Sequence, residues 1–219
     1  MTGTRRPTEV RRTEIADAAL RLIGARGVAA LTVNALAGEL GLTGGALYRH
    51  YPSTEAILEA VAARAVELLD ASTPPEGPSP REWLREFAAA RTATVGGHAG
   101  LSRLLLSEQF AFALPASAHA SLAGAVRRTR EGIVRVLAAG QACGEFRRDL
   151  PPQALAPVVM GTIQMIAMHR AGPVLPRVEG DPLALLDTLL ALLAPPARES
   201  AAKTGGTDTT ADTLKKKRR

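Results

Sequence analysis

Residues 32–51 contain two very short stretches with the spacing of a helix, and both carry side chains that can form hydrogen bonds. Apolar residues at helical spacing lead up to Gly41, and a polar stretch of about two turns follows Thr43 and ends at Pro52. Gly41 can supply the positive φ angle that a tight turn between two helices needs. The second stretch contains Leu-Tyr-Arg-His at 47–50 and is too short and polar to be mainly core. Such a helix is typical of units that present their last helix to the DNA major groove, with helix N-termini facing phosphates.

The surrounding elements are predicted to be helices that position this segment. Apolar residues recur at helical spacing from Thr8 to about Ala25, and Ser53 is expected to cap a longer helix after Pro52. Residues 71–80 are rich in proline and small residues and are predicted to be a linker. The linker ends in a helix start signal, with Ser79 as N-cap, followed by Pro80 and by Glu82 to complete a capping box.

Four or five further helices are expected after the linker. One of them should hold Leu101, Leu104, Leu105 and Phe112, and another should run from about His119 to Ala142. The apolar face of that second helix is predicted from Leu122, Val126, Ile133, Val136 and Leu137. No segment shows a period of two, so the fold class is predicted to be all-α.

Charge is unevenly distributed along the 219 residues. The net charge is +6, with +3 in residues 1–51, −1 in 52–194 and +4 in 195–219. A basic excess points towards nucleic acid, and its position favours the N-terminal unit. The last segment ends in Lys-Lys-Lys-Arg-Arg and is predicted to be a disordered basic tail.

Two C-terminal segments are apolar on nearly all sides. Residues 150–168 carry no formal charge, and Asp187 is the one charge in 183–194. The first segment is nearly long enough for a membrane span, but prolines and glutamines interrupt it, so a buried helix is predicted instead. Helices without a polar stripe must bury more than one face. We therefore expect a homodimer through the helices at about 153–170 and 182–194.

The motifs around the short helices closely resemble the N-terminal DNA-binding domain of the tetracycline-repressor (TetR) family. The likeness covers roughly residues 8–65 and includes Leu-Ala-Gly-Glu-Leu-Gly-Leu-Thr at 36–43 and Gly-Ala-Leu-Tyr-Arg-His-Tyr-Pro-Ser at 45–53. It implies a homodimeric transcriptional regulator, usually a repressor, whose helical C-terminal domain dimerises and binds a small ligand.

The resemblance also assigns roles to individual residues. It implies that Thr32 and Thr43 start helices that meet the phosphate backbone, that Tyr48 and His50 contact phosphates, and that Asn34 and Arg49 can reach base edges. Gly44 and Gly45 leave the start of the recognition helix without side chains that read bases, and Ser53-Thr54-Glu55 lacks the lysine frequent in the family. Additional backbone or minor-groove contacts are expected from Arg5, Arg6, Arg11 and Arg12. The predicted DNA-binding set is Thr32, Asn34, Thr43, Gly44, Gly45, Ala46, Tyr48, Arg49 and His50.

A ligand pocket is predicted from apolar and aromatic residues of the C-terminal part, with Gln164 as a polar group that could orient a ligand. These residues can equally form ordinary core. The candidates are Trp83, Phe87, Phe110, Phe112, Met160, Ile163, Gln164 and Met168. Cys143 is the only cysteine and is expected to be buried or half-buried. The scattered histidines indicate neither a metal site nor a cofactor.

These observations predict a helix-turn-helix DNA-binding domain at 1–52 with an arm at 1–7, a connecting helix and linker at 53–79, a ligand-binding and dimerisation domain at 80–194, and a tail at 195–219. The expected function is a cytoplasmic repressor that binds a palindromic operator on double-stranded DNA as a homodimer and is released by a small apolar ligand. A ligand-independent architectural DNA-binding protein is an alternative, and an all-α enzyme is a weaker one, because no catalytic motif is present.

Overall fold

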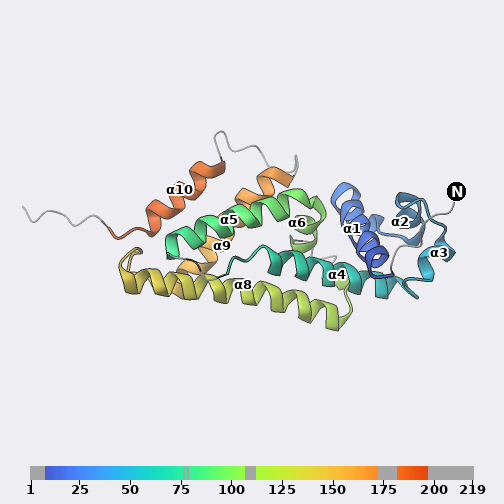
Figure 1. Cartoon of the computed structure of the whole chain (residues 1–219), viewed down its shortest axis with the longest axis horizontal. Helices are drawn as coiled ribbons and strands as arrows, with labels where there is room; N and C mark the ends of the chain where they lie inside the picture. The colour runs from blue at the N-terminus through green and yellow to red at the C-terminus, as the bar shows by residue number, and fades with distance from the viewer. Residues whose placement is uncertain (1–7, 76, 78, 107–111, 172–181, 197–219) are drawn as a thin grey trace, which may run out of the picture.

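The computed structural model describes residues 8–75, 77, 79–106, 112–171 and 182–196. Every regular element in these ranges is a helix, so the predicted all-α class is confirmed. The molecule is elongated, with α1, α2 and α3 at one end and α10 at the other (Figure 1). The predicted arm at 1–7 and residues 197–219 of the predicted tail lie outside the described residues.

Helices α1 (Thr8–Arg26), α2 (Val33–Glu39) and α3 (Gly44–Tyr48) form the N-terminal unit, with a short 3₁₀ turn η1 (Val28–Ala30) after α1. The hydroxyl of Thr32 accepts a hydrogen bond from the backbone N–H of Ala35 at 3.2 Å, and that of Thr43 accepts one from Ala46 at 3.2 Å. Each hydroxyl satisfies a first-turn donor that has no partner within its helix. Gly41 has a φ of 63°, as the turn between α2 and α3 requires.

Helix α4 (Thr54–Ala71) leads away from this unit, and α5 (Pro80–Gly97) follows the linker. Both predicted N-caps are confirmed: the Ser53 hydroxyl accepts from the N–H of Ala56 at 3.1 Å, and the Ser79 hydroxyl accepts from Glu82 at 3.1 Å. Pro80 occupies the first turn of α5, where its missing N–H removes no helical hydrogen bond.

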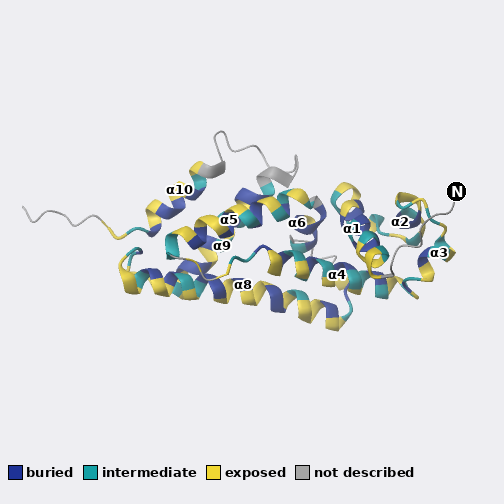
Figure 2. Cartoon of the chain, in the orientation of Figure 1, coloured by how far each residue is buried: buried dark blue, intermediate teal, exposed yellow. Residues whose placement is uncertain are grey.

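The remaining described helices are α6 (Ala99–Leu106), α8 (Ala116–Cys143), α9 (Pro152–Ala171) and α10 (Pro182–Leu193). The long helix α8 lies along α4 and α9, and α5 packs on α9. Figure 2 shows buried and exposed residues alternating along α8 and α10. No helix within the described ranges has both the length and the hydropathy to cross a bilayer.

Two clusters of buried apolar side chains hold these helices together. The first core joins α1–α4 to α5, α6, α8 and α9, so it contains residues from both the N-terminal unit and the rest of the chain. The second core joins α5, α8, α9 and α10. Large members of the first core include Ile15, Leu20, Ile23, Leu36, Leu47, Tyr51, Ile57, Leu69, Leu101 and Leu104. Large members of the second include Trp83, Leu84, Phe87, Ile133, Leu137, Phe146, Ile163 and Leu190.

Helix α6 approaches α1 at a glycine. A Cβ atom added at Gly100 would overlap the carbonyl oxygen of Leu20 in the middle of α1. The absence of a side chain at Gly100 therefore lets the two helix backbones come this close.

Three predictions about individual side chains are wrong. Cys143 is exposed, because it lies in the last turn of α8 on the solvent side. Phe112 is 88% exposed and lies beyond the end of α6, which stops at Leu106. Val126 was expected on the buried face of α8 and is 37% exposed.

Candidate DNA-binding surface and ligand cavity

The polar residues predicted to contact DNA lie on or beside α2 and α3, at one end of the molecule (Figures 1 and 2). The side chain of Tyr48 is 48% exposed although it is large and aromatic. Leu47 beside it is fully buried and Tyr51 is 7% exposed, so both belong to the first core. The exposed members of the predicted set are Thr32, Asn34, Thr43, Gly45, Tyr48 and Arg49, and the half-buried members are Gly44, Ala46 and His50.

The starts of α2 and α3 lie side by side. A Cβ atom added at Gly44 would lie 3.8 Å from Oδ1 of Asn34, so the Asn34 side chain borders the first turn of α3. The structure therefore brings Asn34 together with the exposed residues of α3 on one surface.

The end of α3 is fixed to α1 through Arg12. Nη2 of Arg12 donates a hydrogen bond to the carbonyl oxygen of His50 at 3.5 Å, and the guanidinium lies 5.6 Å from the centre of the Tyr51 ring. The hydroxyl of Tyr51 donates to the carbonyl oxygen of Arg12 at 3.3 Å. Burial raises the pKa of Tyr51 above its ordinary value, which keeps this donor protonated. Arg12 thus holds the end of the candidate recognition helix in place.

The charges of this surface differ in how they are paired. Arg11 forms an ion pair with Glu14 at 2.9 Å. Arg64 of α4 donates from Nε to Asp17 of α1 at 2.8 Å, which ties the two helices together. Arg49 forms no ion pair with any part of the chain that the structure describes. Its guanidinium is therefore available to an anion outside the protein.

A cavity of about 270 Å³ lies among α4, α5, α6, α8 and α9, and we call it the inner cavity. Of the predicted ligand residues, it brings together Phe87, Met160, Ile163 and Gln164. The whole lining is Leu69, Phe87, Arg91, Leu105, Val126, Thr129, Pro157, Met160, Gly161, Ile163 and Gln164. Most of this wall is hydrocarbon, which suits an organic ligand.

The inner cavity also contains a buried arginine that the sequence interpretation missed. Arg91 of α5 is 4% exposed, its Nη2 donates to the hydroxyl of Thr129 at 3.3 Å, and its guanidinium lies 4.9 Å from the Phe87 ring centre. Burial lowers the pKa of Arg91 to about 10, although the charge of Asp70 acts in the opposite direction. Arg91 follows Leu84, Phe87 and Ala88 at helical spacing, which was the available signal.

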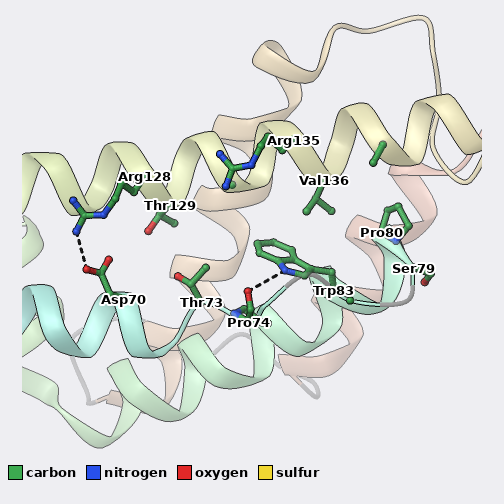
Figure 3. Close-up of a pocket in the computed structure, with 13 residues that line it drawn as sticks. Asp70, Thr73, Pro74, Ser79, Pro80, Trp83, Arg128, Thr129, Arg135 and Val136 are labelled. Carbon is green, nitrogen blue, oxygen red and sulfur yellow. Dashed lines mark hydrogen bonds and ion pairs between the residues drawn. The ribbon is translucent and has the colours of Figure 1, made fainter.

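A second hollow, the outer groove, has a volume of about 660 Å³ and lies between α8 and the linker before α5 (Figure 3). Trp83 lines it, and its Nε1 donates to the carbonyl oxygen of Pro74 at 3.2 Å. Arg128 forms an ion pair with Asp70 at 2.7 Å across the groove. Thr129 lines both hollows, and the Trp83 ring stacks on Phe87 with 5.2 Å between centres, so the two hollows are neighbours.

The other predicted ligand residues lie elsewhere. Phe112 is exposed to solvent and lines neither hollow, and Met168 on α9 lines neither hollow either. Phe110 lies outside the described residues. Within the described ranges, no group of three or more His, Cys, Asp or Glu residues is placed to hold a metal ion.

Comparisons with known proteins agree with this architecture. Residues 15–61 match the family model described as bacterial regulatory proteins, tetR family. The chain is similar to PfmR, a TetR-family transcriptional regulator from Thermus thermophilus, with 23% identity and a TM-score of 0.65 over 87% of this chain and 94% of that one. It is also similar to the ketosteroid transcriptional regulator KstR2 of Mycobacterium tuberculosis, with 20% identity and a TM-score of 0.68 over 88% and 98%.

A third similar structure is that of AibR in complex with isovaleryl coenzyme A and operator DNA, with 20% identity and a TM-score of 0.67 over 85% of this chain and 99% of that one. No curated protein sequence matches the chain. The three N-terminal helices, with α3 exposed, have the arrangement of a helix-turn-helix DNA-binding fold. Residues 15–61 match the tetR family model, and the rest of the chain shares the fold of TetR-family structures, so the resemblance seen in the N-terminal sequence is confirmed.

Proposed function

We propose that this protein is a transcriptional repressor that binds a palindromic operator as a homodimer and leaves it when a small ligand enters the inner cavity. The observation that carries the DNA-binding part is the surface of α3. Tyr48 and Arg49 are exposed there with no salt bridge to the described chain, while Leu47 anchors the helix in the first core. A buried anchor with exposed polar neighbours suits a helix that enters the major groove.

The proposed contacts follow from the chemistry of these side chains. The Tyr48 hydroxyl and the helix starts at Thr32 and Thr43 suit phosphate oxygens, which position the protein. Arg49 suits the O6 and N7 acceptors of guanine, and Asn34 borders the same helix and can reach a neighbouring base edge. His50 lies at the fixed end of α3, where a phosphate contact is proposed.

Selection of bound DNA from a random library tests the proposal, and fluorescence anisotropy with the selected site measures the affinity. We expect Arg49→Ala to weaken binding by about 5- to 150-fold, equivalent to about 1–3 kcal/mol, and to relax specificity at one base pair. Tyr48→Phe should weaken binding to all sequences by a smaller factor. Arg130→Ala is the matched control, because Arg130 is exposed on α8, a helix that lies apart from α3 (Figure 1). Unchanged affinity for both α3 variants would refute the assignment of this surface.

A footprint separates the proposal from the architectural alternative. A sequence-specific regulator should protect one palindrome whose half-sites are about one helical turn apart. Protection without sequence preference, together with a steep dependence on salt, would favour the architectural protein instead.

The homodimer is proposed from the outer faces of α9 and α10. Val158 on α9 is 56% exposed and Leu192 on α10 is 61% exposed, and both are large and apolar. Asp187, the one charge of α10, forms an ion pair with Arg85 of α5 at 2.9 Å, so its charge is compensated within the protomer. Covering these two faces with those of a second copy would remove apolar surface from water.

Light scattering tests the dimer. Wild-type protein at micromolar concentration should have twice the mass of the chain, and Leu192→Glu or Val158→Glu should shift it towards the monomer because a charge would be buried in the interface. Val10→Glu is the control, since Val10 is 46% exposed on α1 at the opposite end of the molecule. A monomeric wild-type protein would contradict the proposal.

Ligand release is proposed because two helices that line the inner cavity also pack against α1. Leu69 of α4 and Leu105 of α6 line the cavity, and both helices contact α1. A ligand that binds one arrangement of these helices more tightly shifts the population towards it, and the two recognition helices then no longer fit successive major grooves. AibR was solved with both a coenzyme A thioester and operator DNA, so this fold can accommodate both kinds of molecule.

A further inference from the structure

The inner cavity contains a positive charge that the described protein does not neutralise. Arg91 is 4% exposed, and it forms no ion pair with a carboxylate of the described residues. Asp70 raises the pKa of Arg91, but that carboxylate is paired with Arg128 at 2.7 Å. A buried cation without an anionic partner is costly, so its presence in a cavity wall points to a partner that is brought in from outside.

The hydrogen-bond donors of this wall are also incompletely used. Nη2 of Arg91 donates to Thr129, whereas its Nε is buried and has no acceptor. Nε2 of Gln164, on the opposite helix α9, is likewise buried without an acceptor. Both side chains line the inner cavity. Buried N–H groups almost always have partners, so two unsatisfied donors in one cavity indicate that acceptor atoms occupy it in the liganded state.

From these groups we infer that the inner cavity binds a small organic carboxylate, with its two oxygens held by Arg91 and Gln164 and its hydrocarbon body against the apolar wall. This inference rests on the proposed function and deepens it by giving the chemical class of the ligand, a carboxylate with a hydrocarbon body in place of the small apolar ligand expected from the sequence.

The choice of a carboxylate follows from charge, shape and size. One guanidinium can balance one negative charge and can donate two parallel hydrogen bonds to a carboxylate. The other walls are supplied by side chains such as Phe87, Leu105, Met160 and Ile163, which offer no further charge for a phosphate dianion. A volume of about 270 Å³ lies just below the usual range of ligand cavities, so the hydrocarbon body must be short or compact.

Trp83 provides a direct readout of binding. It is the only tryptophan of the chain, and its ring stacks on Phe87, which lines the inner cavity. A ligand that contacts Phe87 should therefore change the fluorescence of Trp83. The probes are the straight-chain carboxylic acids from butyric to decanoic acid, each paired with its methyl ester, and isothermal titration calorimetry confirms each affinity without DNA.

We expect at least one acid of the series to bind, and its methyl ester to bind at least about 30-fold more weakly because the ester has no negative charge. Arg91→Met should weaken binding of that acid by a similar factor, and Gln164→Leu by a smaller one. Arg130→Met is the matched control, since Arg130 is an exposed arginine of α8 that lines neither hollow. Circular dichroism verifies that each variant is folded.

Three results would overturn the inference: no acid of the series binds, the ester binds as tightly as the acid, or the Arg91→Met variant binds the acid as wild type does. Operator DNA is added in a separate titration. If an acid binds in the Arg91-dependent manner but leaves the affinity for the operator unchanged, the ligand class stands and ligand release is refuted. If no DNA can be selected from the library while the acid binds, the DNA-binding proposal is refuted and the ligand class still stands.

Discussion

Replacing Arg91 with methionine should make the ligand-free protein more stable. The side chain is buried in the wall of the inner cavity, and its charge is not compensated by a carboxylate of the described residues. Methionine is similar in length, carries no charge and adapts to irregular apolar spaces. If Arg91 served folding alone, its replacement should lower the stability of the protein. The sign of the change in stability therefore distinguishes a ligand-binding residue from a structural one.

The size of the effect can be estimated from the pKa. Burial lowers the pKa of Arg91 from its ordinary value to about 10. Each tenfold change in an equilibrium constant is worth about 1.4 kcal/mol, so the charged form costs the folded state about 3 kcal/mol. For a base with a lowered pKa in the folded state, this cost is fully present below the folded value, falls as the pH rises above about 10, and disappears only above the ordinary pKa of the unfolded chain. At pH 7 the whole cost therefore applies.

The guanidinium also makes contacts that methionine loses. Its contact with the Phe87 ring at 4.9 Å and its hydrogen bond to the Thr129 hydroxyl at 3.3 Å are each worth about 1 kcal/mol. The difference leaves a net gain of about 1 kcal/mol, which corresponds to a rise in Tm of about 2–4 °C for a chain of this size.

Thermal unfolding followed by circular dichroism at pH 7 measures this change. The protein concentration is held constant, because the Tm of the proposed dimer would depend on it. Arg85→Met is the control on the same helix: its ion pair with Asp187 is exposed, so its loss should lower stability by at most about 1 kcal/mol. A Tm for Arg91→Met several degrees below wild type would refute the reasoning and make Arg91 a structural residue.

Three further predictions concern the contact of α6 with α1, the N-cap of α3 and the last turn of α8. Gly100→Ala should lower the Tm by several degrees and weaken operator binding, because the new Cβ would overlap the Leu20 carbonyl oxygen and separate α6 from α1. Thr43→Ala should cost about 1 kcal/mol of stability in urea unfolding, because Ala46 N–H loses its 3.2 Å cap. Cys143 should react with a thiol reagent in the folded protein without delay, because it is exposed.

Matched changes serve as controls for these three predictions. Gly97→Ala should have little effect, since no atom lies within 4 Å of a Cβ added there. Thr43→Ser keeps the capping hydroxyl and should retain stability, whereas a loss equal to that of Thr43→Ala would argue against the cap. Slow modification of Cys143 that tracks global unfolding would show that this thiol is buried.

Local signals explain why so much of the helical framework could be predicted from the sequence. The caps at Thr32, Thr43, Ser53 and Ser79 act within four residues of themselves, and the turn at Gly41 requires a conformation that glycine adopts readily. Such interactions do not depend on the tertiary fold, so the sequence pattern is sufficient to locate them.

The cavity could be predicted only in part, because its lining depends on how distant helices pack. Apolar neighbours in the sequence correctly indicate four lining residues: Phe87, Met160, Ile163 and Gln164. Phe112 is predicted from its residue type alone, and it lies exposed beyond α6. Arg91 was missed because a charged residue is ordinarily assumed to face water. Its position on the buried side of α5, one turn after Phe87 and one turn before Val95, is what places its charge in the cavity.

The first core has a consequence for how the protein unfolds. Because Leu36 and Leu47 of the helix-turn-helix unit share a buried cluster with Val95, Leu101 and Leu104, the DNA-binding helices cannot melt without exposing apolar surface of the rest of the chain. Unfolding should then be a single cooperative transition, and a ligand held deep in the protein should raise the melting temperature of the recognition helix as well. If the proposed ligand releases the protein from DNA, it would at the same time protect the N-terminal unit from heat and proteolysis.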